Sequence, residues 1–158
     1  MILSFKTKIN GKPTYFPEKI WSGLGDVCNK YNYCIDEFHT GLMNVGFDDQ
    51  RDHKPKLHTI RKDDKNRWKP GMMIDFFINA RQKDMFRFAP RIPVVSIQYI
   101  GILHYRDNSE VNIDGRYLFP SEVEKLAKND GFESVDDFFQ YFNEDYNGII
   151  IHWTNLKY

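Results

Sequence analysis

The pattern that most constrains the fold is a series of strand-forming segments joined by short turns. The segment RIPVVSIQYIGILHY is long and β-branched, which predicts a strand, with Gly101 marking a bend or bulge. VNIDGRYL follows it and contains Asp114-Gly115, the dipeptide typical of a two-residue hairpin turn. WKPG predicts a turn in which Gly71 has a positive φ. Four other segments also predict strands: MILSFK, KLHTIRK, MMIDFFINA and GIIIHW.

Three segments predict short helices. In YFPEKIWSGL, Pro17 suits a first helical position and apolar residues recur at helical spacing. In EVEKLAKND, we expect Ser121 and Glu124 to form a capping box, and Ser134 should cap VDDFFQYFNED. Residues 25–55 are less regular. They combine a weak helical pattern through Tyr31, Ile35, Phe38 and Leu42 with a polar run, which predicts an insertion holding about one helix.

The order of these elements predicts an α+β fold. Short turns join the strands, and the βαβ alternation that a parallel sheet requires is missing. We therefore expect a small, partly closed mixed β-barrel decorated with short helices. A chain of 158 residues fits a single domain, spanning 1–158, because a second core is hard to build at this length.

Composition narrows the functional class. Lys plus Arg and Asp plus Glu both number 22, so a basic footprint over the whole protein is absent, although a local basic patch remains open. Two cysteines make neither a disulfide framework nor a zinc motif, and five histidines match no metal-binding spacing. The start resembles no signal peptide, and no run has the ~20 apolar residues that span a membrane. We expect a soluble, cytoplasmic protein without a metal or cofactor.

The segment KLHTIR carries the most suggestive chemistry. Along a strand, Thr59 and Arg61 share one face while His58 and Ile60 share the other, and Lys56 reaches in from the preceding loop. A threonine hydroxyl becomes a nucleophile when a base removes its proton, and a lysine serves as that base if its pKa is lowered. The alternative is an ordinary strand with a polar edge, and spacing alone favours that alternative.

The same segment resembles the ASCH domain family of the PUA-like superfamily. The family motif runs Gly-x-Lys-x-x-Thr/Glu-x-Arg, and Lys56, Thr59 and Arg61 fill its last three places. Lys54 stands where the motif has glycine. Four further segments resemble later parts of the family pattern: RWKPGMMIDF, VVSIQYIGI, EVEKLAKNDGFESVDDFFQYF and GIIIHW. The resemblance covers most of residues 1–24 and 54–158.

One branch of that family consists of amidohydrolases that remove acetate from N4-acetylcytidine. The resemblance implies Thr59 as nucleophile, Lys56 as base or oxyanion stabiliser, and Asp130 as the carboxylate that manages protons. Asp130 comes from the NDGF segment, where the branch carries glutamate. The insertion at 25–55 lies directly before the motif and is a departure from the family pattern.

Binding without catalysis is the main alternative. A basic run surrounds Trp68, and such a run with an aromatic suits a nucleotide or single-stranded RNA, although a solvated charged loop explains it equally well. We predict four ligand-binding residues: Arg61, His58, Trp68 and Lys54. The expected partner is a nucleoside or an RNA-related ligand, and ribonuclease activity is a third alternative. An oligomer is neither indicated nor excluded.

Overall fold

The computed structural model describes residues 1–25, 36–44, 46–47, 52–106 and 108–158. They form two compact units, each made from two stretches of chain. Unit 1 comprises Met1–Lys56 and Met72–Pro93, and unit 2 comprises Leu57–Gly71 and Val94–Tyr158. Compactness does not establish whether each unit folds alone, so the single domain over 1–158 stays a prediction.

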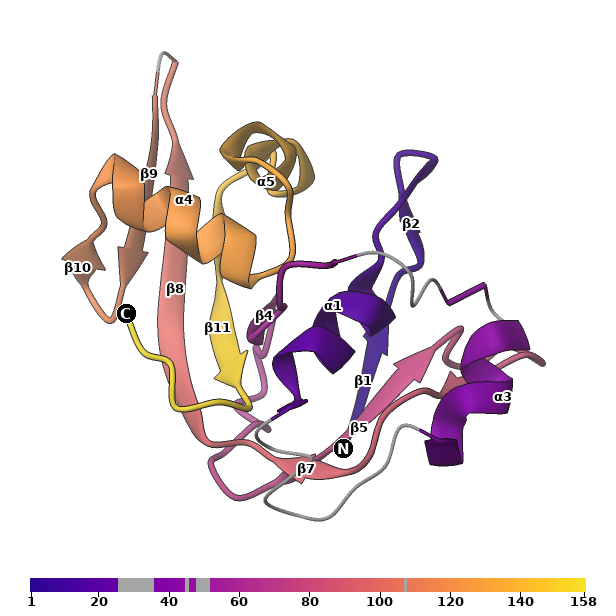
Figure 1. The fold of residues 1–158 in the computed structure, drawn as a ribbon. Coiled ribbons are helices and arrows are strands. Elements are labelled where there is room, and N and C mark those ends of the chain that lie inside the picture. The colour runs from indigo at the N-terminus through magenta and orange to yellow at the C-terminus, as the bar shows by residue number, and fades with distance from the viewer. Residues whose placement is uncertain (26–35, 45, 48–51, 107) are drawn as a thin grey trace. The chain divides into compact units, whose positions relative to one another are not determined.

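The described part of unit 1 contains a small mixed sheet and two helices (Figure 1). Its elements are β1 (Ile2–Phe5), β2 (Lys8–Ile9), β3 (Lys12–Pro13), α1 (Phe16–Gly23), α3 (Asp36–Asn44), β5 (Met73–Ile78), β6 (Phe86–Arg87) and β7 (Ile92–Pro93). Strand β1 is parallel to β5, and β6 and β7 are each antiparallel to β5. The rings of Phe5, Phe76 and Phe88 pack together with centroids 5.8–6.0 Å apart, forming an aromatic core.

The helices of unit 1 agree with the sequence pattern. Pro17 lies in the first turn of α1, where its missing N–H costs no hydrogen bond. Helix α3 lies within the expected insertion at 25–55, and its Phe38 and Leu42 are buried as the helical pattern requires. The other two positions of that pattern, Tyr31 and Ile35, lie outside the described residues.

Unit 2 is a five-stranded antiparallel sheet with two helices. Its elements are β4 (His58–Arg61), β8 (Ser96–His104), β9 (Ser109–Ile113), β10 (Arg116–Tyr117), α4 (Pro120–Asn129), α5 (Val135–Tyr141) and β11 (Tyr146–His152). The strand order is β10-β9-β8-β11-β4. The α+β class is confirmed, but the described strands form open sheets and no closed barrel. Among the described strands, β10 and β4 are the edges of this sheet, since each pairs with one neighbour.

The turns of unit 2 largely follow the sequence. Asp114 and Gly115 have φ values of 52° and 83° and close the β9–β10 hairpin, as predicted. Gly71 has the expected positive φ of 86°. The predicted bend or bulge at Gly101 is wrong, because Gly101 pairs regularly with Asn112 on one side and Asn147 on the other.

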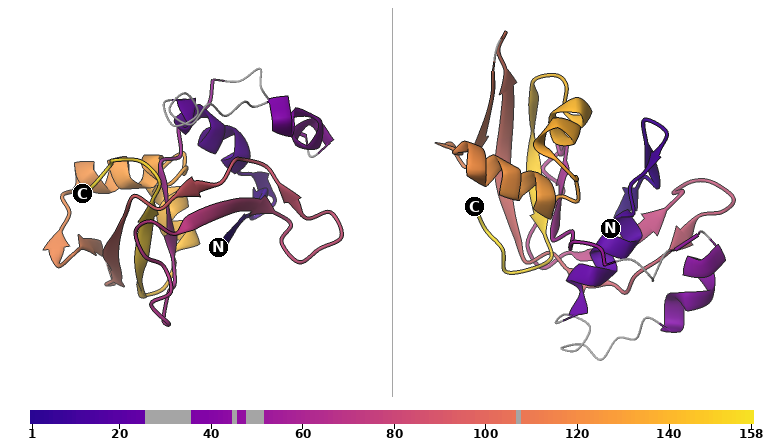
Figure 2. Two further views of the ribbon diagram at one scale, coloured as in Figure 1. Left: turned by 90° about the horizontal axis from the view of Figure 1, so that it is seen from below. Right: turned by 45° about the horizontal axis from the view of Figure 1, so that its top comes forward.

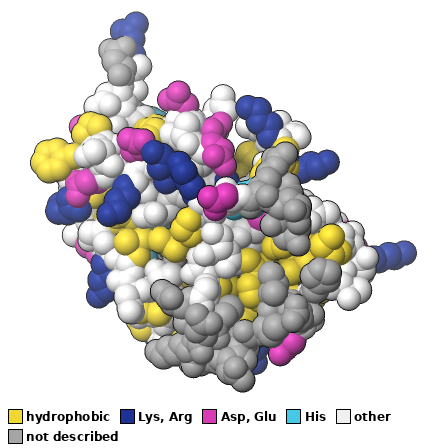
Figure 3. Space-filling view, in the orientation of Figure 1, with side chains coloured by type: hydrophobic (Ala, Val, Ile, Leu, Met, Phe, Trp, Pro, Cys, Tyr) yellow, Lys and Arg dark blue, Asp and Glu magenta, His cyan; other side chains and the backbone are white. Residues whose placement is uncertain are grey.

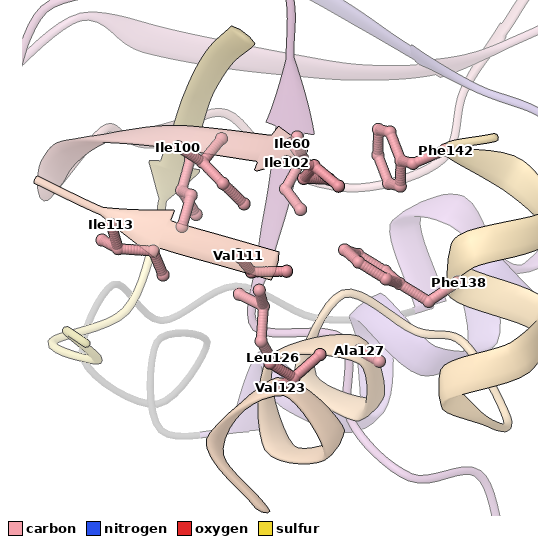
Figure 4. Packing of buried hydrophobic residues seen from close by; sticks show 11 residues of the cluster. Ile60, Ile100, Ile102, Val111, Ile113, Val123, Leu126, Ala127, Phe138 and Phe142 are labelled. Atoms are coloured by element: carbon pink, nitrogen blue, oxygen red, sulfur yellow. The ribbon is translucent and has the colours of Figure 1, made fainter. Parts of the chain in front are cut away.

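Helices α4 and α5 cover one face of this sheet (Figures 1 and 2). Alternate residues of the strands point at the helices and form the core with Leu126, Phe138 and Phe142 (Figure 4). Leu126 and Phe138 are fully buried, and each such side chain stabilises the fold by about 1.5–3 kcal/mol relative to an exposed one. We call this face of the sheet the helix face and the opposite one the second face.

The start of α4 differs from the sequence prediction. The helix begins at Pro120, so the predicted capping box of Ser121 and Glu124 is wrong. Instead the Glu122 carboxylate accepts a hydrogen bond from the backbone N–H of Phe119, the N-cap residue, at 2.9 Å. The cap of α5 is as predicted, because Ser134 Oγ accepts from the Asp137 N–H at 3.0 Å.

Candidate functional site

The end of α4 explains the NDGF segment. Gly131 has a φ of 90°, its N–H bonds to Lys128 O, and the Phe132 N–H bonds to Ala127 O. This is the Schellman arrangement, which needs glycine at that position. It leaves Asn129 as the last helical residue and Asp130 as the C-cap residue. A carboxylate at a helix C-terminus meets the negative end of the helix dipole, so Asp130 requires a compensating partner.

His58, in the segment KLHTIR, is one such partner. The Leu57 N–H donates to Asn129 O at 2.8 Å, which fixes β4 beside the end of α4. His58 Nδ1 then lies 3.5 Å from Asp130 Oδ1, and both side chains are buried. The distance is long for a hydrogen bond but short for an electrostatic contact. The two segments singled out by the ASCH resemblance therefore meet in unit 2.

The phenol of Tyr158 joins the same cluster. Asn129 Nδ2 donates to the Tyr158 hydroxyl oxygen at 2.9 Å, and this hydroxyl lies 2.7 Å from His58 Nε2. If the Tyr158 hydroxyl donates its proton to His58 Nε2, the imidazole proton lies on Nδ1, facing Asp130; if His58 Nε2–H donates instead, the hydroxyl oxygen accepts from both His58 and Asn129. Burial raises the pKa of Tyr158, so the phenol stays protonated.

The backbone of Tyr158 is held as firmly as its ring. The Gln98 side chain on β8 accepts from the Tyr158 N–H at 2.9 Å and donates to the Tyr158 carbonyl at 3.0 Å. Gln98 Nε2 also donates to Asp114 Oδ2 at 3.0 Å, which fixes the orientation of the Gln98 amide. We call the residues around Tyr158 the ring site: His58, Gln98, Asn129 and His152.

His152 forms the floor of the ring site beside His58. The two residues are direct partners across β11 and β4, and their ring centroids lie 5.3 Å apart. His152 is fully buried, and within the described part of the chain neither of its ring nitrogens has a hydrogen-bond partner. Burial, reinforced by the neighbouring His58, lowers the pKa of His152 to about 3, so it is neutral at ordinary pH. On β8 its cross-strand partner is Ser96.

Thr59 lies on the other side of the sheet. His58 contacts Asp130 and Ile60 belongs to the helix-face core, so Thr59 and Arg61 point to the second face. The structure thus confirms the predicted alternation along KLHTIR. It brings Asp130 to His58 and does not bring it to Thr59. Thr59 is buried and faces the same way as Ile151, its partner on β11.

The three remaining predicted residues do not belong to one unit: Lys54 and Lys56 are part of unit 1, and Trp68 is part of unit 2. Lys56 belongs to unit 1, where it is 1% exposed, its N–H donates to Lys19 O, and its Nζ lies 4.7 Å from the Phe16 ring centroid. Lys54 is exposed. Trp68 is 6% exposed, so its ring is not presented to a base in this conformation.

Sequence reasoning missed Asn129, Gln98 and Tyr158. Asn129 had a signal, since it adjoins Asp130 in NDGF, but only the helix end shows that its side chain turns toward β4. Gln98 and Tyr158 had none, because isolated polar residues in a strand and in a terminal segment are common. His152, at the end of the predicted strand GIIIHW, is a buried neighbour of His58 in the structure.

The described residues contain no group of three or more His, Cys, Asp or Glu side chains placed to hold a metal ion. None of their helices has the length and apolar character needed to cross a membrane.

Comparison of the chain with protein-family models, curated proteins and solved structures finds no significant match in any of the three.

Proposed function

We propose that unit 2 binds a nucleoside or RNA-related ligand through its base, at the ring site that Tyr158 fills. One observation carries the proposal: three segments of the ASCH resemblance contribute His58, Asn129 and His152 around a single planar ring. The PUA-like fold and the family relationship belong to this proposal as well.

The chemistry of the ring site suits a nucleobase. Asn129 offers an N–H to a carbonyl oxygen, and His58 Nε2 accepts from an O–H or N–H at the ring edge. Cytosine presents both groups, an acceptor oxygen and a donor amine. The His58 and His152 rings, at 5.4 and 6.1 Å from the Tyr158 centroid, provide an aromatic surrounding.

Tyr158 competes with such a ligand in this arrangement. The apparent affinity is lowered by the fraction of molecules in which the site is open. Replacing Tyr158 with alanine removes the competing ring, so Tyr158→Ala should bind cytidine and N4-acetylcytidine more tightly than the unaltered protein does. Tyr158→Phe keeps the ring and is the matched control, for which no gain is expected.

Calorimetric titration of each folded variant with these nucleosides tests the proposal. Asn129→Ala added to Tyr158→Ala should abolish the gain, because a donor to the base is lost. If Tyr158→Ala binds phenol and cytidine with equal affinity, the nucleoside only fills the cavity left by the tyrosine ring and the site does not recognise a base. Absence of nucleoside binding by a folded Tyr158→Ala protein would refute the proposal.

Hydrolysis of an N4-acylated cytosine is the second candidate. One observation favours it: Thr59 is 2% exposed, whereas an ordinary polar residue at a strand edge meets solvent. In this version the Thr59 hydroxyl attacks the acyl carbon and its proton passes to the departing cytosine amine, and water then hydrolyses the acyl-threonine ester to release the acid. The His58–Asp130 pair lies on the other face of the sheet from Thr59, so it is a separate candidate base, acting on water.

Turnover of N4-acetylcytidine separates these assignments. Loss of activity in Thr59→Ala with activity retained in Asp130→Asn would support the Thr59 nucleophile alone. The opposite pattern would assign the chemistry to His58 and Asp130. If the folded, unaltered protein produces no acetate, hydrolysis of this substrate is excluded and base binding without turnover is left.

A further inference from the structure

A serine and a histidine face each other at the end of the β8–β9 hairpin. His104, the last residue of β8, is the direct cross-strand partner of Ser109, the first residue of β9. Both residues are half-buried. His104 lies six residues along β8 from Gln98, which is about 20 Å at the usual rise of a strand. Chemistry at this pair is therefore separate from nucleoside binding at the ring site.

The hydrogen bonds of His104 fix which ring nitrogen carries the proton in the neutral imidazole. Nε2 lies 2.7 Å from the Phe142 carbonyl oxygen, which accepts hydrogen bonds and cannot donate them. Nε2 therefore carries the proton, and Nδ1 presents a lone pair. Ser109 Oγ lies 2.8 Å from this Nδ1, so the serine hydroxyl donates its hydrogen bond to the imidazole.

A serine hydroxyl that donates to a neutral imidazole has the arrangement of an activated nucleophile. Serine alone is a weak nucleophile, and an adjacent base activates it by taking the proton as the oxygen attacks. Histidine suits this task because its charge changes near neutral pH. The Phe142 carbonyl orients the His104 ring and stabilises the imidazolium that forms when Nδ1 accepts the proton.

Three further contacts hold the two side chains in place. The His104 backbone N–H donates to Asp145 Oδ1 at 2.8 Å, which joins the end of β8 to the residue before β11. The Phe139 ring of α5 meets the imidazole edge-on, with ring centroids 5.8 Å apart. The Tyr105 N–H donates to Asn108 O at 2.8 Å and closes the hairpin. The pair is therefore positioned before a substrate arrives.

The pair is within reach of a substrate. The end of the β8–β9 hairpin extends beyond α4 into solvent (Figures 1 and 3). Arg106 and Asn108, which lie between His104 and Ser109 in the sequence, are exposed. Phe139 is only partly buried and packs against the helix-face core, so it gives the site an apolar side. An acyl group can lie on this side while its leaving group faces water.

We infer that Ser109 is a reactive nucleophile that accepts acyl groups from activated esters, with His104 as its base. Ser109 Oγ bonds to the acyl carbon while Nδ1 takes the hydroxyl proton. The bond from the acyl carbon to the leaving oxygen then breaks, and the leaving alcohol takes the proton from Nδ1. Water hydrolyses the acyl-serine ester by the same route, which releases the carboxylic acid and restores the serine.

Acylation of Ser109 should be easier to detect than turnover. The hairpin end lies in water, so the negative charge that develops on the acyl oxygen is stabilised mainly by solvent. A preorganised donor to that oxygen contributes about 10²–10³ in rate in enzymes that enclose it. A covalent probe of the serine is therefore the first measurement.

An alkyl fluorophosphonate is the probe. Ser109 Oγ bonds to phosphorus, fluoride leaves, and the hydroxyl proton passes to Nδ1. Peptide mass spectrometry should find the label at Ser109 of the folded protein, and both Ser109→Ala and urea-unfolded protein should lose it. Ser121, an exposed serine in the first turn of α4, is the control in the same sample and should react at least tenfold more slowly.

His104→Ala should slow labelling of Ser109 by about a hundredfold or more, the usual loss for a catalytic base. Added imidazole should restore part of the rate, which a purely structural histidine does not allow. If His104→Ala does not fold, His104→Gln takes its place. Absence of label at Ser109 in the folded protein overturns the inference, and so does full labelling of a folded His104 variant.

Release of nitrophenol from p-nitrophenyl acetate tests the ester itself. The unaltered protein should release it faster than Ser109→Ala does, and equal release by the two proteins would overturn the assignment to esters. Because the pair lies apart from the ring site, Ser109→Ala should leave nucleoside binding by Tyr158→Ala unchanged.

Discussion

His152 is the residue whose surroundings are hardest to reconcile with a purely structural role. It is buried, neutral and without a hydrogen-bond partner among the described residues. Burying such polar atoms costs free energy, and an apolar residue of similar size would avoid that cost. Its position beside His58 and under Tyr158 accounts for its presence if the ring site binds a ligand.

The low pKa of His152 predicts an acid-sensitive fold. An unfolded histidine titrates near 6.5, whereas His152 in the folded protein titrates at about 3. Between these values the unfolded state binds the extra proton, so stability is lost as the pH falls from about 6.5 toward 3. The greatest slope from one such group is about 1.4 kcal/mol per pH unit. Urea unfolding at several pH values measures it.

His152→Leu should flatten this dependence, because the titrating group is gone. His53→Gln, which removes a histidine from unit 1, is the control. The assignment fails if both variants change the slope equally, or if His152→Leu keeps the slope of the unaltered protein. His58, Asp130, Asp114 and Lys157 also act on His152, so part of the dependence should persist.

At the residue scale, the alternation of side chains along KLHTIR was predicted correctly, but the side chain that meets Asp130 was not. The spacing in KLHTIR correctly separated His58 and Ile60 from Thr59 and Arg61, because alternation is a local property of a strand. Which face meets Asp130 depends on where α4 ends and how it packs, and no local pattern contains that information. The two segments therefore meet as the resemblance implies, with His58 in the position expected for Thr59.

At the scale of elements, the two predicted helix caps provide a matched experiment. Ser134→Ala removes the acceptor of the Asp137 N–H and should destabilise the protein by about 1 kcal/mol. Ser121→Ala lies inside α4 on an exposed position, where alanine is a better helix former, so no loss is expected. Thermal unfolding of both variants measures the difference. A larger loss of stability in Ser121→Ala than in Ser134→Ala would support the capping box that the sequence predicts.

Two glycines of the sheet give a second matched pair. A Cβ on Gly148 would lie 2.6 Å from the Arg61 carbonyl oxygen, whereas a Cβ on Gly101 would meet the end of the Asn112 side chain. Backbone yields less readily than a side chain, so Gly148→Ala should cost about 1–3 kcal/mol and Gly101→Ala less. Chemical denaturation compares them. Equal losses of stability in Gly148→Ala and Gly101→Ala would show that β4 shifts freely against β11.

Elements set by local chemistry were predicted well, and those set by distant pairing were not. Asp114-Gly115 closes its hairpin because both residues tolerate positive φ. The closed barrel failed because it depends on which distant strands pair. Strand β1 pairs with β5 in unit 1, whereas β4 pairs with β11 in unit 2.

At the scale of the whole molecule, the chain passes between the units directly inside the predicted motif, after Lys56. The ring site, by contrast, is built from unit 2 residues alone. Nucleoside binding at the ring site consequently requires only that unit 2 be folded. Whether unit 2 folds by itself is therefore the decisive property of the molecule for this function.

We predict that unit 2 folds without unit 1. The Gly71 N–H bonds to Val94 O at 2.8 Å, so removing residues 72–93 leaves ends that a short Gly-Ser linker can join. The product, 57–71 linked to 94–158, keeps all five strands, both helices and the core around Leu126 and Phe138. It should unfold cooperatively in denaturant, with dispersed amide NMR signals.

Ile60→Ala in this shortened protein is the control, since Ile60 joins β4 to the core and its loss should cost about 2–5 kcal/mol. If the shortened protein folds and the substitution unfolds it, the chain contains a separable domain that carries the ring site. If the shortened protein is disordered while the full chain is folded, the two units depend on one another for stability. The single domain over 1–158 is then the correct description, and a substitution that unfolds unit 1 should also unfold unit 2.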